Sequence, residues 1–383
     1  MVAQRVGIHG IGVVSGYGWG RELFWEGLLT GKSAAVRTTC DRSGETMWLA
    51  RVPHGGSPGD GPSRFARAMR AAAREAIEDA RGRGWRAGRR VGLLHAIVLG
   101  EVDLWRDFYT ERAGELPSRQ YLALMPSTPM SALMQEYGFH GPAMTVSAMC
   151  ASGNAGLITA KAWLDAGIVD DVVFVATDLS LTPENVRHFV RLGVAVTDVE
   201  PSEACRPFQE GSLGFVMGEA SVSFVLSARE GRPYVYTLGG AMSHDAHHVT
   251  SIEPSLTAIV ECVRDALAVS GVPASAVHHF NAHGPGTAQC DRAESAVLER
   301  LFPPRVGLYS VKPLTGHCQG AASAVEVAVT ALGYDRGVVP APPVVAAAHP
   351  QLLDGPTPVT GGITLKSSIG MGGHNSAVVL AAP

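Results

Sequence analysis

The stretch VSAMCASGNAG, residues 146–156, carries the first sign of both fold and chemistry, with Cys150 at its centre. The short apolar run before it, residues 143–146, predicts the end of a strand, and the small residues after it, 151–164, predict a buried helix. Cys150 would then lie at the first turn of a helix that begins inside the protein. Unpaired N–H groups and the helix dipole favour a thiolate there, and a thiolate is the nucleophilic form of cysteine.

Two histidine motifs follow in the second part of the chain. The first is NAHGPGT, residues 281–287, which comes after an apolar stretch; the second is KPLTGH, residues 312–317, which leads into an alanine-rich segment. His283 and His317 therefore each sit in a glycine-rich turn at the end of an element, where loops present reactive groups on a rigid scaffold. Either histidine motif alone is weak evidence of a catalytic site.

These three motifs together resemble the beta-ketoacyl synthases of the thiolase superfamily, specifically the elongating type with a Cys-His-His site. The resemblance is collinear over nearly the whole chain, and each further match is glycine-rich and weak when taken alone. The further matches are the opening segment 6–33, RPF at 206–208 with GFVMGE at 214–219, MSHDAH at 242–247 and GMGGHN at 370–375.

The resemblance implies an α/β fold with five layers, α-β-α-β-α, made of two similar halves. We place the first half at residues 1–232, with the nucleophilic cysteine, and the second at 233–383, with the two histidines. The residues themselves indicate only strands alternating with helices, which favours sheets covered on both faces. Strands are expected at 6–14, 91–99, 172–176, 221–226, 234–238 and 277–281, helices at 22–29, 64–80, 129–137 and 256–269, and a loop at 54–63.

Composition excludes several classes of protein. The chain has 383 residues, 46% of them hydrophobic and 17% charged, with a net charge of −4, so nothing suggests nucleic-acid binding. No apolar run approaches the roughly 20 residues of a membrane span, and the N-terminus has no apolar signal core. The six cysteines show no paired spacing, as expected in a reducing compartment. We therefore expect a cytoplasmic protein that is not in a membrane.

For the chemistry, the resemblance implies an acyltransferase that uses no bound cofactor. An acyl group would move from the phosphopantetheine arm of an acyl carrier protein to Cys150, and malonyl-carrier protein would then lose carbon dioxide and attack it. His283 and His317, neutral and donating from Nε2, would stabilise the enolate, while Lys312 would orient His317 and pair with Glu326. The expected oxyanion and gate residues are Gly370, Met371 and Gly372, with the backbone N–H of Cys150.

Departures from the family pattern bear on substrate and partner. Pro285 replaces a threonine that binds the arm, and Met371 replaces a phenylalanine gate, which suggests specialised polyketide chemistry more than housekeeping fatty-acid synthesis. The expected substrate-binding residues are Thr287, Thr315, His374 and Asn375, and the expected carrier-docking residues are Arg64 and Arg67. No metal site is expected, because the histidine pairs at 247–248 and 278–279 lack partner ligands.

Several functions stay open at this point. The acyl group could be joined to oxygen or nitrogen instead of carbon. The chain could be a partner subunit resembling a chain-length factor, although that role does not need a cysteine and two histidines. A protein that only binds acyl thioesters would form no covalent acyl-cysteine. The partner could be a second copy of the chain or a chain-length-factor-like subunit, and the sequence names neither the acyl chain nor the pathway.

Overall fold

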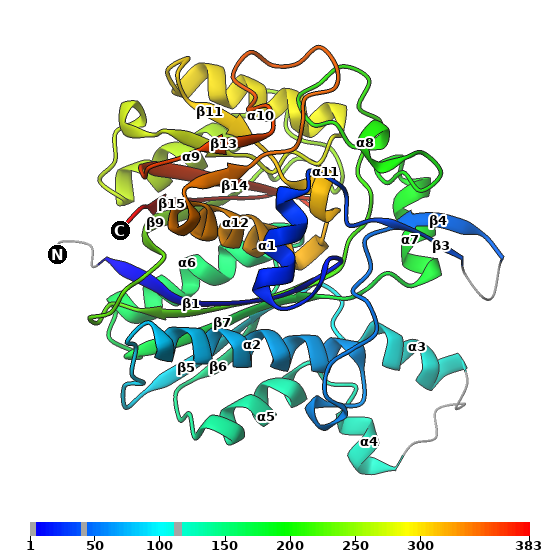
Figure 1. The fold of residues 1–383 in the computed structure, drawn as a ribbon, viewed down its shortest axis with the longest axis vertical. Coiled ribbons are helices and arrows are strands. Elements are labelled where there is room, and N and C mark those ends of the chain that lie inside the picture. The colour runs from blue at the N-terminus through cyan, green and yellow to red at the C-terminus, as the bar shows by residue number, and fades with distance from the viewer. Residues whose placement is uncertain (1–4, 40–43, 111–116) are drawn as a thin grey trace.

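The strands of two similar halves follow the same order outward from a shared seam (Figure 1). The computed structural model describes residues 5–39, 44–110 and 117–383. The seam is the pairing of the first strand of each half, β1 and β9. Outward from it, each half places its last strand, its second-last strand and then two further strands. The strands are β1 (Val6–Ser15), β8 (Ala220–Ser227), β7 (Asp171–Asp178), β5 (Val91–Ala96) and β6 (Ala143–Val146), then β9 (Val235–His244), β15 (His374–Ala381), β14 (Ile363–Gly370), β10 (His279–Asn281) and β11 (Gly307–Tyr309).

Helices complete the five layers predicted from the sequence. α6 (Ser152–Asp165) and α12 (Ala322–Arg336) form the middle layer, and each packs on strands of both halves. α2 (Arg64–Gly82) and α5 (Ser127–Tyr137) cover the outer face of the first half, whereas α9 (Thr257–Val269) and α10 (Ala288–Leu301) cover that of the second (Figure 1). α12 is buried over twelve consecutive residues, as a helix that is apolar all round must be. The layered α/β fold is thus confirmed.

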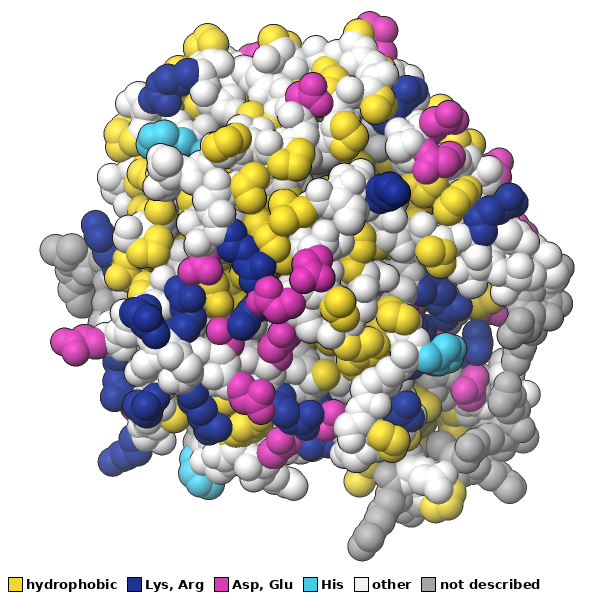
Figure 2. Space-filling model, in the orientation of Figure 1, with side chains coloured by type: hydrophobic (Ala, Val, Ile, Leu, Met, Phe, Trp, Pro, Cys, Tyr) yellow, Lys and Arg dark blue, Asp and Glu magenta, His cyan; other side chains and the backbone are white. Residues whose placement is uncertain are grey.

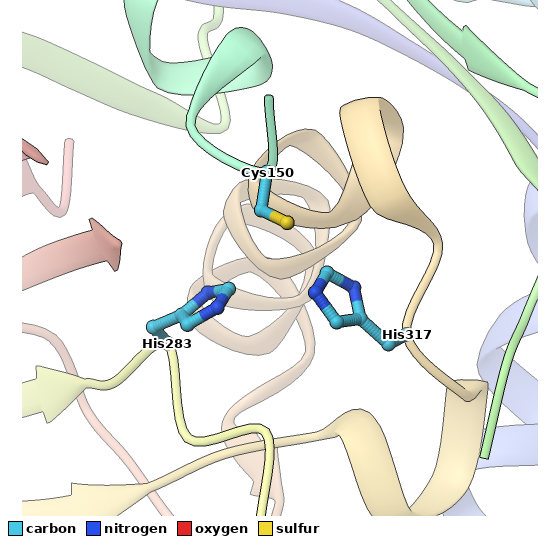
Figure 3. Close-up of side chains that lie close together, drawn as sticks. All are labelled: Cys150, His283 and His317. Atoms are coloured by element: carbon cyan, nitrogen blue, oxygen red, sulfur yellow. The ribbon is translucent and has the colours of Figure 1, made fainter. Parts of the chain in front are cut away.

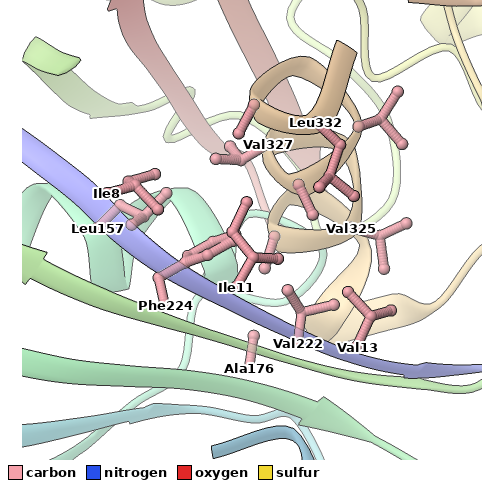
Figure 4. Packing of buried hydrophobic residues seen from close by; sticks show 14 of the residues in the cluster. Ile8, Ile11, Val13, Leu157, Ala176, Val222, Phe224, Val325, Val327 and Leu332 are labelled. Carbon is pink, nitrogen blue, oxygen red and sulfur yellow. The ribbon is translucent and has the colours of Figure 1, made fainter. Parts of the chain in front are cut away.

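The largest apolar cluster lies between β1, β7, β8 and α12 (Figure 4). Ile8, Ile11 and Val13 of β1 point into it beside Val222 and Phe224 of β8. On the opposite face of β1, glycine is required, because a Cβ at position 10 or 12 would run into carbonyl oxygens of α2. The glycine-rich opening strand therefore lets α2 lie directly on the sheet.

The remaining elements are shorter and connect these layers. They are β2 (Gly18–Trp19), β3 (Val36–Thr39), β4 (Thr46–Leu49), β12 (Val338–Pro340), β13 (Pro356–Pro358), α1 (Arg21–Leu29), α3 (Val102–Thr110), α4 (Ser118–Leu122), α7 (Pro183–Arg191), α8 (Pro201–Ala204), α11 (Lys312–Thr315) and the 3-10 turns η1 (Pro58–Asp60), η2 (Ala274–Ala276) and η3 (Gln319–Ala321).

The predicted elements lie where expected, with shifts at their ends. The strand expected at 91–99 ends at Ala96, the helix expected at 129–137 begins at Ser127, and the loop expected at 54–63 contains the turn η1. The predicted boundary between residues 232 and 233 lies in the connection from β8 to β9. Within the described ranges, none of the helices has the length and apolar character needed to cross a membrane.

Candidate active site

Cys150 is held in a strained turn immediately before α6. Met149 has a φ of +50°, which is left-handed and rare for a residue other than glycine. The Ser152 hydroxyl accepts a hydrogen bond from the N–H of Ala148 at 2.8 Å and donates to the carbonyl of Met149 at 2.6 Å. The Ser368 hydroxyl donates to the carbonyl of Cys150 at 3.0 Å. The turn is therefore tied to its own helix and to β14, which fixes the direction of the thiol.

His283 follows β10, and its backbone is fixed by a buried carboxylate. Glu294 of α10 accepts hydrogen bonds from the N–H groups of His283 and Gly284, both at 2.7 Å. The hydroxyl of Ser367 also donates to Glu294. Sequence reasoning did not identify Glu294, because a single glutamate in a helix gives no sign that it caps the preceding turn.

His317 is held by the segment GFVMGE, residues 214–219. Its N–H donates to the carbonyl of Val216 at 2.7 Å, and its carbonyl accepts from the N–H of Gly218 at 3.0 Å. The ring of Phe215 packs edge-on against the imidazole, with ring centroids 4.7 Å apart. The segment GFVMGE, which the sequence analysis identified only by resemblance, thus holds the backbone and the ring of His317 in place.

The three predicted catalytic side chains meet in the interior (Figure 3). The sulfur of Cys150 and one nitrogen from each histidine ring all lie within 4.8 Å of one another. The ring centroids of His283 and His317 are 5.3 Å apart. All three residues are buried. Cys150 and His317, more than 160 positions apart in the chain, thus share one small space with His283, as the family resemblance implies.

Hydrogen bonds to the ring nitrogens assign the same tautomer to both histidines. Nδ1 of His283 lies 3.2 Å from Nζ of Lys312, and Nδ1 of His317 accepts from the N–H of Gln319 at 3.2 Å. Because an ammonium and an amide can only donate, each ring carries its proton on Nε2. Burial and the charge of Lys312 hold the pKa of both imidazoles well below the usual value of 6.5. Both histidines are therefore neutral Nε2–H donors.

A buried ion-pair network supports His283. Lys312 donates to the carbonyl of His283 and pairs with Glu326, and the exposed fractions of both side chains are 1%. Lys312 therefore orients His283, and the prediction that it orients His317 is wrong. The reason is the position of Glu326. The backbone carbonyl of Glu326 accepts a hydrogen bond from Nδ2 of Asn281, the last residue of β10, at 2.9 Å, so the carboxylate that binds Lys312 lies near His283. The network also contains Lys366, which sequence reasoning missed; its Nζ lies 2.6 Å from Oε2 of Glu326.

The thiol does not have the lowered pKa expected of a helix start. Burial raises the pKa of Cys150 to about 11, and the charge of Lys312 and the N–H groups of Met371 and Cys150 oppose this increase only in part. α6 begins at Ser152, two residues after the thiol, so the sulfur gains little from the first turn of the helix. The resting form is therefore the thiol, and the thiolate must form within the reaction.

The glycine loop after β14 faces the thiol. The N–H groups of Met371 and Cys150 lie close enough to the Cys150 sulfur to lower its pKa, so both are near the carbon that the sulfur would attack and are candidates for an oxyanion hole. A Cβ at Gly370 would lie 2.9 Å from the carbonyl oxygen of Ala148, so any larger residue would push the loop away. Gly370, Met371 and Gly372 all line the cavity above Cys150.

This cavity has a volume of about 350 Å³ and opens to the surface. Thr287 and Pro285 line it, together with apolar side chains such as Val194 and Ile252. Cys290, which sequence reasoning did not single out, also contributes to its wall. An apolar cavity with a nucleophile at its base suits a linear or folded acyl chain.

Three predicted substrate-binding residues do not line the cavity. The hydroxyl of Thr315 donates to the carbonyl of Gly316 at 2.9 Å and is buried inside its own turn. The ring of His374 packs on that of His244, with centroids 5.1 Å apart. Nδ2 of Asn375 donates to Oδ1 of Asp245 at 2.6 Å, and Asp245 in turn lines the cavity. The prediction that Thr315, His374 and Asn375 bind substrate directly is therefore wrong, because strand and turn geometry direct these side chains to contacts within the protein.

The two predicted docking arginines are engaged within the protein. Arg64 forms a bidentate pair with Glu219 at 2.9 and 3.1 Å, and the carboxylate of Glu219 is fully buried. Arg67 donates to the carbonyls of Gly61 and Pro62 at 2.9 and 3.1 Å. Figure 2 shows basic and acidic side chains interleaved over the region of α2. These contacts remove Arg64 from a docking surface and tie Arg67 to the loop that precedes α2.

Cysteine and histidine are also the usual ligands of zinc, and the three catalytic atoms form a group of the right composition. In this structure, however, Nδ1 of His283 lies 3.2 Å from the ammonium of Lys312, and Nδ1 of His317 accepts from the N–H of Gln319. The arrangement suits a negatively charged intermediate better than a metal ion.

Comparisons with known proteins agree on one family. Models of the beta-ketoacyl synthase N-terminal and C-terminal domains match residues 61–231 and 234–345. The ketoacyl synthase alpha subunit of the tetracenomycin polyketide synthase from Streptomyces glaucescens is 31% identical, covering 99% of this chain and 97% of that protein. The barley chloroplast 3-oxoacyl-[acyl-carrier-protein] synthase I is 28% identical, covering 99% and 89%.

Solved structures show the same thiolase-like fold. A type II polyketide ketosynthase, solved in complex with its acyl-carrier protein and bound to a hexaketide, superposes with a TM-score of 0.88 at 24% identity over 100% of both chains. A ketosynthase from Xenorhabdus doucetiae in complex with its chain length factor gives 0.85 at 22% identity over 99% and 98%. At these identities the likeness supports the fold and nothing finer.

Proposed function

The chain belongs to the beta-ketoacyl synthase family, and we propose that it is a decarboxylating ketosynthase that extends an acyl group held on Cys150. The observation that carries the proposal is the meeting of a buried thiol with two neutral Nε2–H donors within 4.8 Å. A thiol can store an acyl group, and neutral donors can stabilise an enolate without protonating it first.

The first step transfers the acyl group. The sulfur of Cys150 attacks the carbonyl carbon of a carrier-bound thioester, and the oxyanion faces the N–H groups of Cys150 and Met371. The bond from carbon to the carrier sulfur then breaks, and the proton of the Cys150 thiol ends on the carrier sulfur. Because the pKa of the thiol is about 11, removal of this proton contributes to the barrier, and the N–H groups around the sulfur lower it.

The second step forms the carbon–carbon bond. The malonyl carboxylate leaves as carbon dioxide, and its electron pair passes to the thioester as an enolate whose oxygen accepts from Nε2 of His283 and His317. The α-carbon then attacks the acyl carbon, and the bond to Sγ of Cys150 breaks. The thiolate takes a proton from solvent, which restores the resting enzyme. Each well-placed donor is expected to contribute roughly 3–4 kcal/mol to the stabilisation of the enolate.

An acyl carrier protein is the proposed donor of both substrates. The exposed rim of the cavity includes Leu192 and Gln289; Arg191 directly precedes Leu192, and Arg292 lies three residues after Gln289 in α10. Arg191 ends α7 and is exposed, and Arg292 donates from Nε to the carbonyl of Ala288 at 3.0 Å, which holds its guanidinium at the rim. Carrier proteins are acidic, so these two arginines replace Arg64 and Arg67 as the proposed docking residues.

Charge reversal tests this docking surface. Arg191→Glu with Arg292→Glu should raise the KM for carrier-bound substrate roughly tenfold and leave a small N-acetylcysteamine thioester nearly unaffected, because rim charges act mainly on encounter. Arg89→Glu, an exposed arginine near the opposite end of β5, is the matched control. Equal losses with both substrates would show that the double change damages the site itself.

A second subunit is proposed at the edge of the first half. β6 is the last strand of the sheet, and its residues Ala143, Met144 and Thr145 are exposed. An edge strand of this kind offers unpaired N–H and C=O groups to another chain. Because relatives include a ketosynthase bound to a chain length factor, the partner is either a second copy or such a subunit. Sedimentation of the purified chain, alone and with candidate partners, separates these two cases.

Acyl loading followed by carbon dioxide release tests the function. The wild type should gain the mass of the acyl group on Cys150 and then release carbon dioxide from malonyl-carrier protein. Loading without any consumption of malonyl thioester would favour the alternative in which the acyl group is joined to oxygen or nitrogen. The absence of loading would favour a non-catalytic partner subunit. The cytoplasmic location predicted from the cysteine pattern is checked by cell fractionation.

A further inference from the structure

Lys366 is a buried ammonium for which the proposed reaction has no assigned role. It lies on β14 with an exposed fraction of 0%, and its Nζ is 2.6 Å from Oε2 of Glu326. It also donates to the carbonyls of Asn281 and Ala282 at 3.4 and 3.2 Å and to that of Ser367. Asn281 is the last residue of β10 and Ala282 follows it, so Lys366 binds the carbonyls of the two residues that lead into His283.

Counting the buried charges around the histidines shows what Lys366 adds. Glu326 of α12 and Glu294 of α10 bring two carboxylates, and Lys312 of α11 brings one ammonium. Without a second cation these three groups would carry one net negative charge; Asp291 of α10 lies near Glu294 and Lys312 as well, and burial raises its pKa to about 7. A negative charge in the interior favours the imidazolium form of a nearby histidine. Lys366 balances the charge of the three groups.

We propose that Lys366 is a positioning residue that shares Glu326 with Lys312, fixes the end of β10 before His283 and keeps both catalytic histidines in their neutral form. Protonated histidines would place a second proton on Nδ1, where Lys312 donates to His283, and that contact would be lost. The inference deepens the proposed function, because neutral Nε2–H donors are what the enolate requires.

The charged groups that face Lys366 support this assignment. Glu326 and Glu294 attract its positive charge, whereas Lys312 repels it. Burial is the largest effect and holds the pKa of Lys366 below its usual value of 10.5. The charge of Lys366 in turn lowers the pKa of His283 and of His317.

The test measures imidazole protonation directly and needs no substrate. In ¹⁵N-labelled protein, the ring signals of His283 and His317 are assigned by their loss in the single alanine variants. In Lys366→Met both histidines should titrate roughly one pH unit or more above the wild type, because the neutralising charge is gone. Lys366→Arg keeps the charge and should restore the wild-type titration.

Thr330→Val is the matched control. Thr330 accepts from Nδ2 of Asn281 at 2.9 Å and contacts the hydroxyl of Tyr309 at 3.0 Å, so its loss disturbs the same network without changing the charge. It should lower the melting temperature but leave both titrations in place. If Lys366→Met behaves like Thr330→Val, Lys366 is only structural and the proposal is wrong. Should Lys366→Met fail to fold, Lys366→Gln keeps a donor for the β10 carbonyls and gives the same readout.

Because the titration does not depend on turnover, its outcome is separate from that of the proposed function. A shifted titration in a protein that never decarboxylates malonyl thioester would support the role of Lys366 and reject the reaction. An unshifted titration in an active ketosynthase would do the opposite. In an active enzyme, Lys366→Met should also lose roughly tenfold more decarboxylation at about pH 5.5 than at about pH 8.

Discussion

The two halves of the molecule place their reactive residues at equivalent points but support them by different means. Cys150 follows the edge strand β6 and precedes the central helix α6, and His317 follows the edge strand β11 and precedes the central helix α12. In the first half, backbone geometry and the hydroxyls of Ser152 and, from β14, Ser368 hold the turn that carries the thiol. In the second half, buried ions hold His283, whereas backbone hydrogen bonds with Val216 and Gly218 hold His317. Equivalent topology therefore does not imply equivalent electrostatics.

The two edge strands differ in the same way. β6 is exposed, whereas β11 is covered by a later segment, in which the N–H of Leu353 donates to the carbonyl of Leu308 at 2.8 Å. A sheet edge without cover is free to pair with another chain. The first half is thus suited to contact a partner, and the second half is closed on itself.

The largest effect is expected from removal of the nucleophile in the first half. Cys150→Ala should abolish acyl loading and lower turnover at least roughly 10³-fold, because the covalent intermediate cannot form. Intact-protein mass after incubation with acyl-carrier thioester measures the loading. Cys290→Ala is the control for the second thiol in the cavity wall. Acyl transfer that persists in Cys150→Ala and disappears in Cys290→Ala would reverse the assignment.

Removal of either histidine should affect the second half of the reaction alone. His283→Ala and His317→Ala should still load Cys150 but release carbon dioxide roughly 10²- to 10³-fold more slowly, because each removes one donor to the enolate. Carbon dioxide release from malonyl-carrier protein is the measurement. A normal rate in either variant would contradict the role given to that histidine.

The buried ions of the second half should dominate stability there. Glu326→Ala leaves Lys312 and Lys366 without their shared partner, and we expect a loss of roughly 3–5 kcal/mol in the free energy of unfolding. Denaturant titration of the variant measures it. Glu261→Ala removes an exposed glutamate that pairs with Arg264 and should cost less than about 1 kcal/mol. Similar losses of unfolding free energy in both variants would show that the buried network stabilises the fold no more than an exposed ion pair does.

The thiol of the first half should respond steeply to pH. With a pKa of about 11, Cys150 is almost entirely protonated at neutral pH, so its alkylation by iodoacetamide should accelerate roughly tenfold for each pH unit up to about pH 10. Peptide mapping must assign the label to Cys150 and not to Cys205, Cys262, Cys290 or Cys318; Cys40 lies outside the described residues. A rate that levels off below about pH 8 would mean that local N–H groups, not burial, set the pKa.

The smallest effect is expected at the loop that faces both halves. Met371→Phe replaces an adaptable side chain with a stiff ring, and should slow the loading of branched and aromatic acyl groups a few-fold relative to straight ones. Loading rates across a panel of acyl thioesters measure this preference. An unchanged rank order would show that residue 371 does not act as a gate.

The sequence alone indicated strands alternating with helices, and its resemblance to a known family implied the five layers and the three residues that meet at the site. Strand and helix periodicity, together with glycine-rich turns around Cys150, His283 and His317, are local signals, and local signals survive in a linear chain. The pair of Lys312 and Glu326 was implied by the family resemblance of the motif that carries the lysine, and not by a local signal.

Only the tertiary structure decided how these residues are charged and what they contact. The pKa of Cys150 depends on burial, which no motif states, and the partner of Lys312 depends on where β10 ends relative to α12. Lys366 contacts Asn281 across 85 positions, Glu294 contacts Ser367 across 73, and Arg64 contacts Glu219 across 155. Long-range electrostatics and desolvation depend on distances through space, and these exist only after the two halves have packed together.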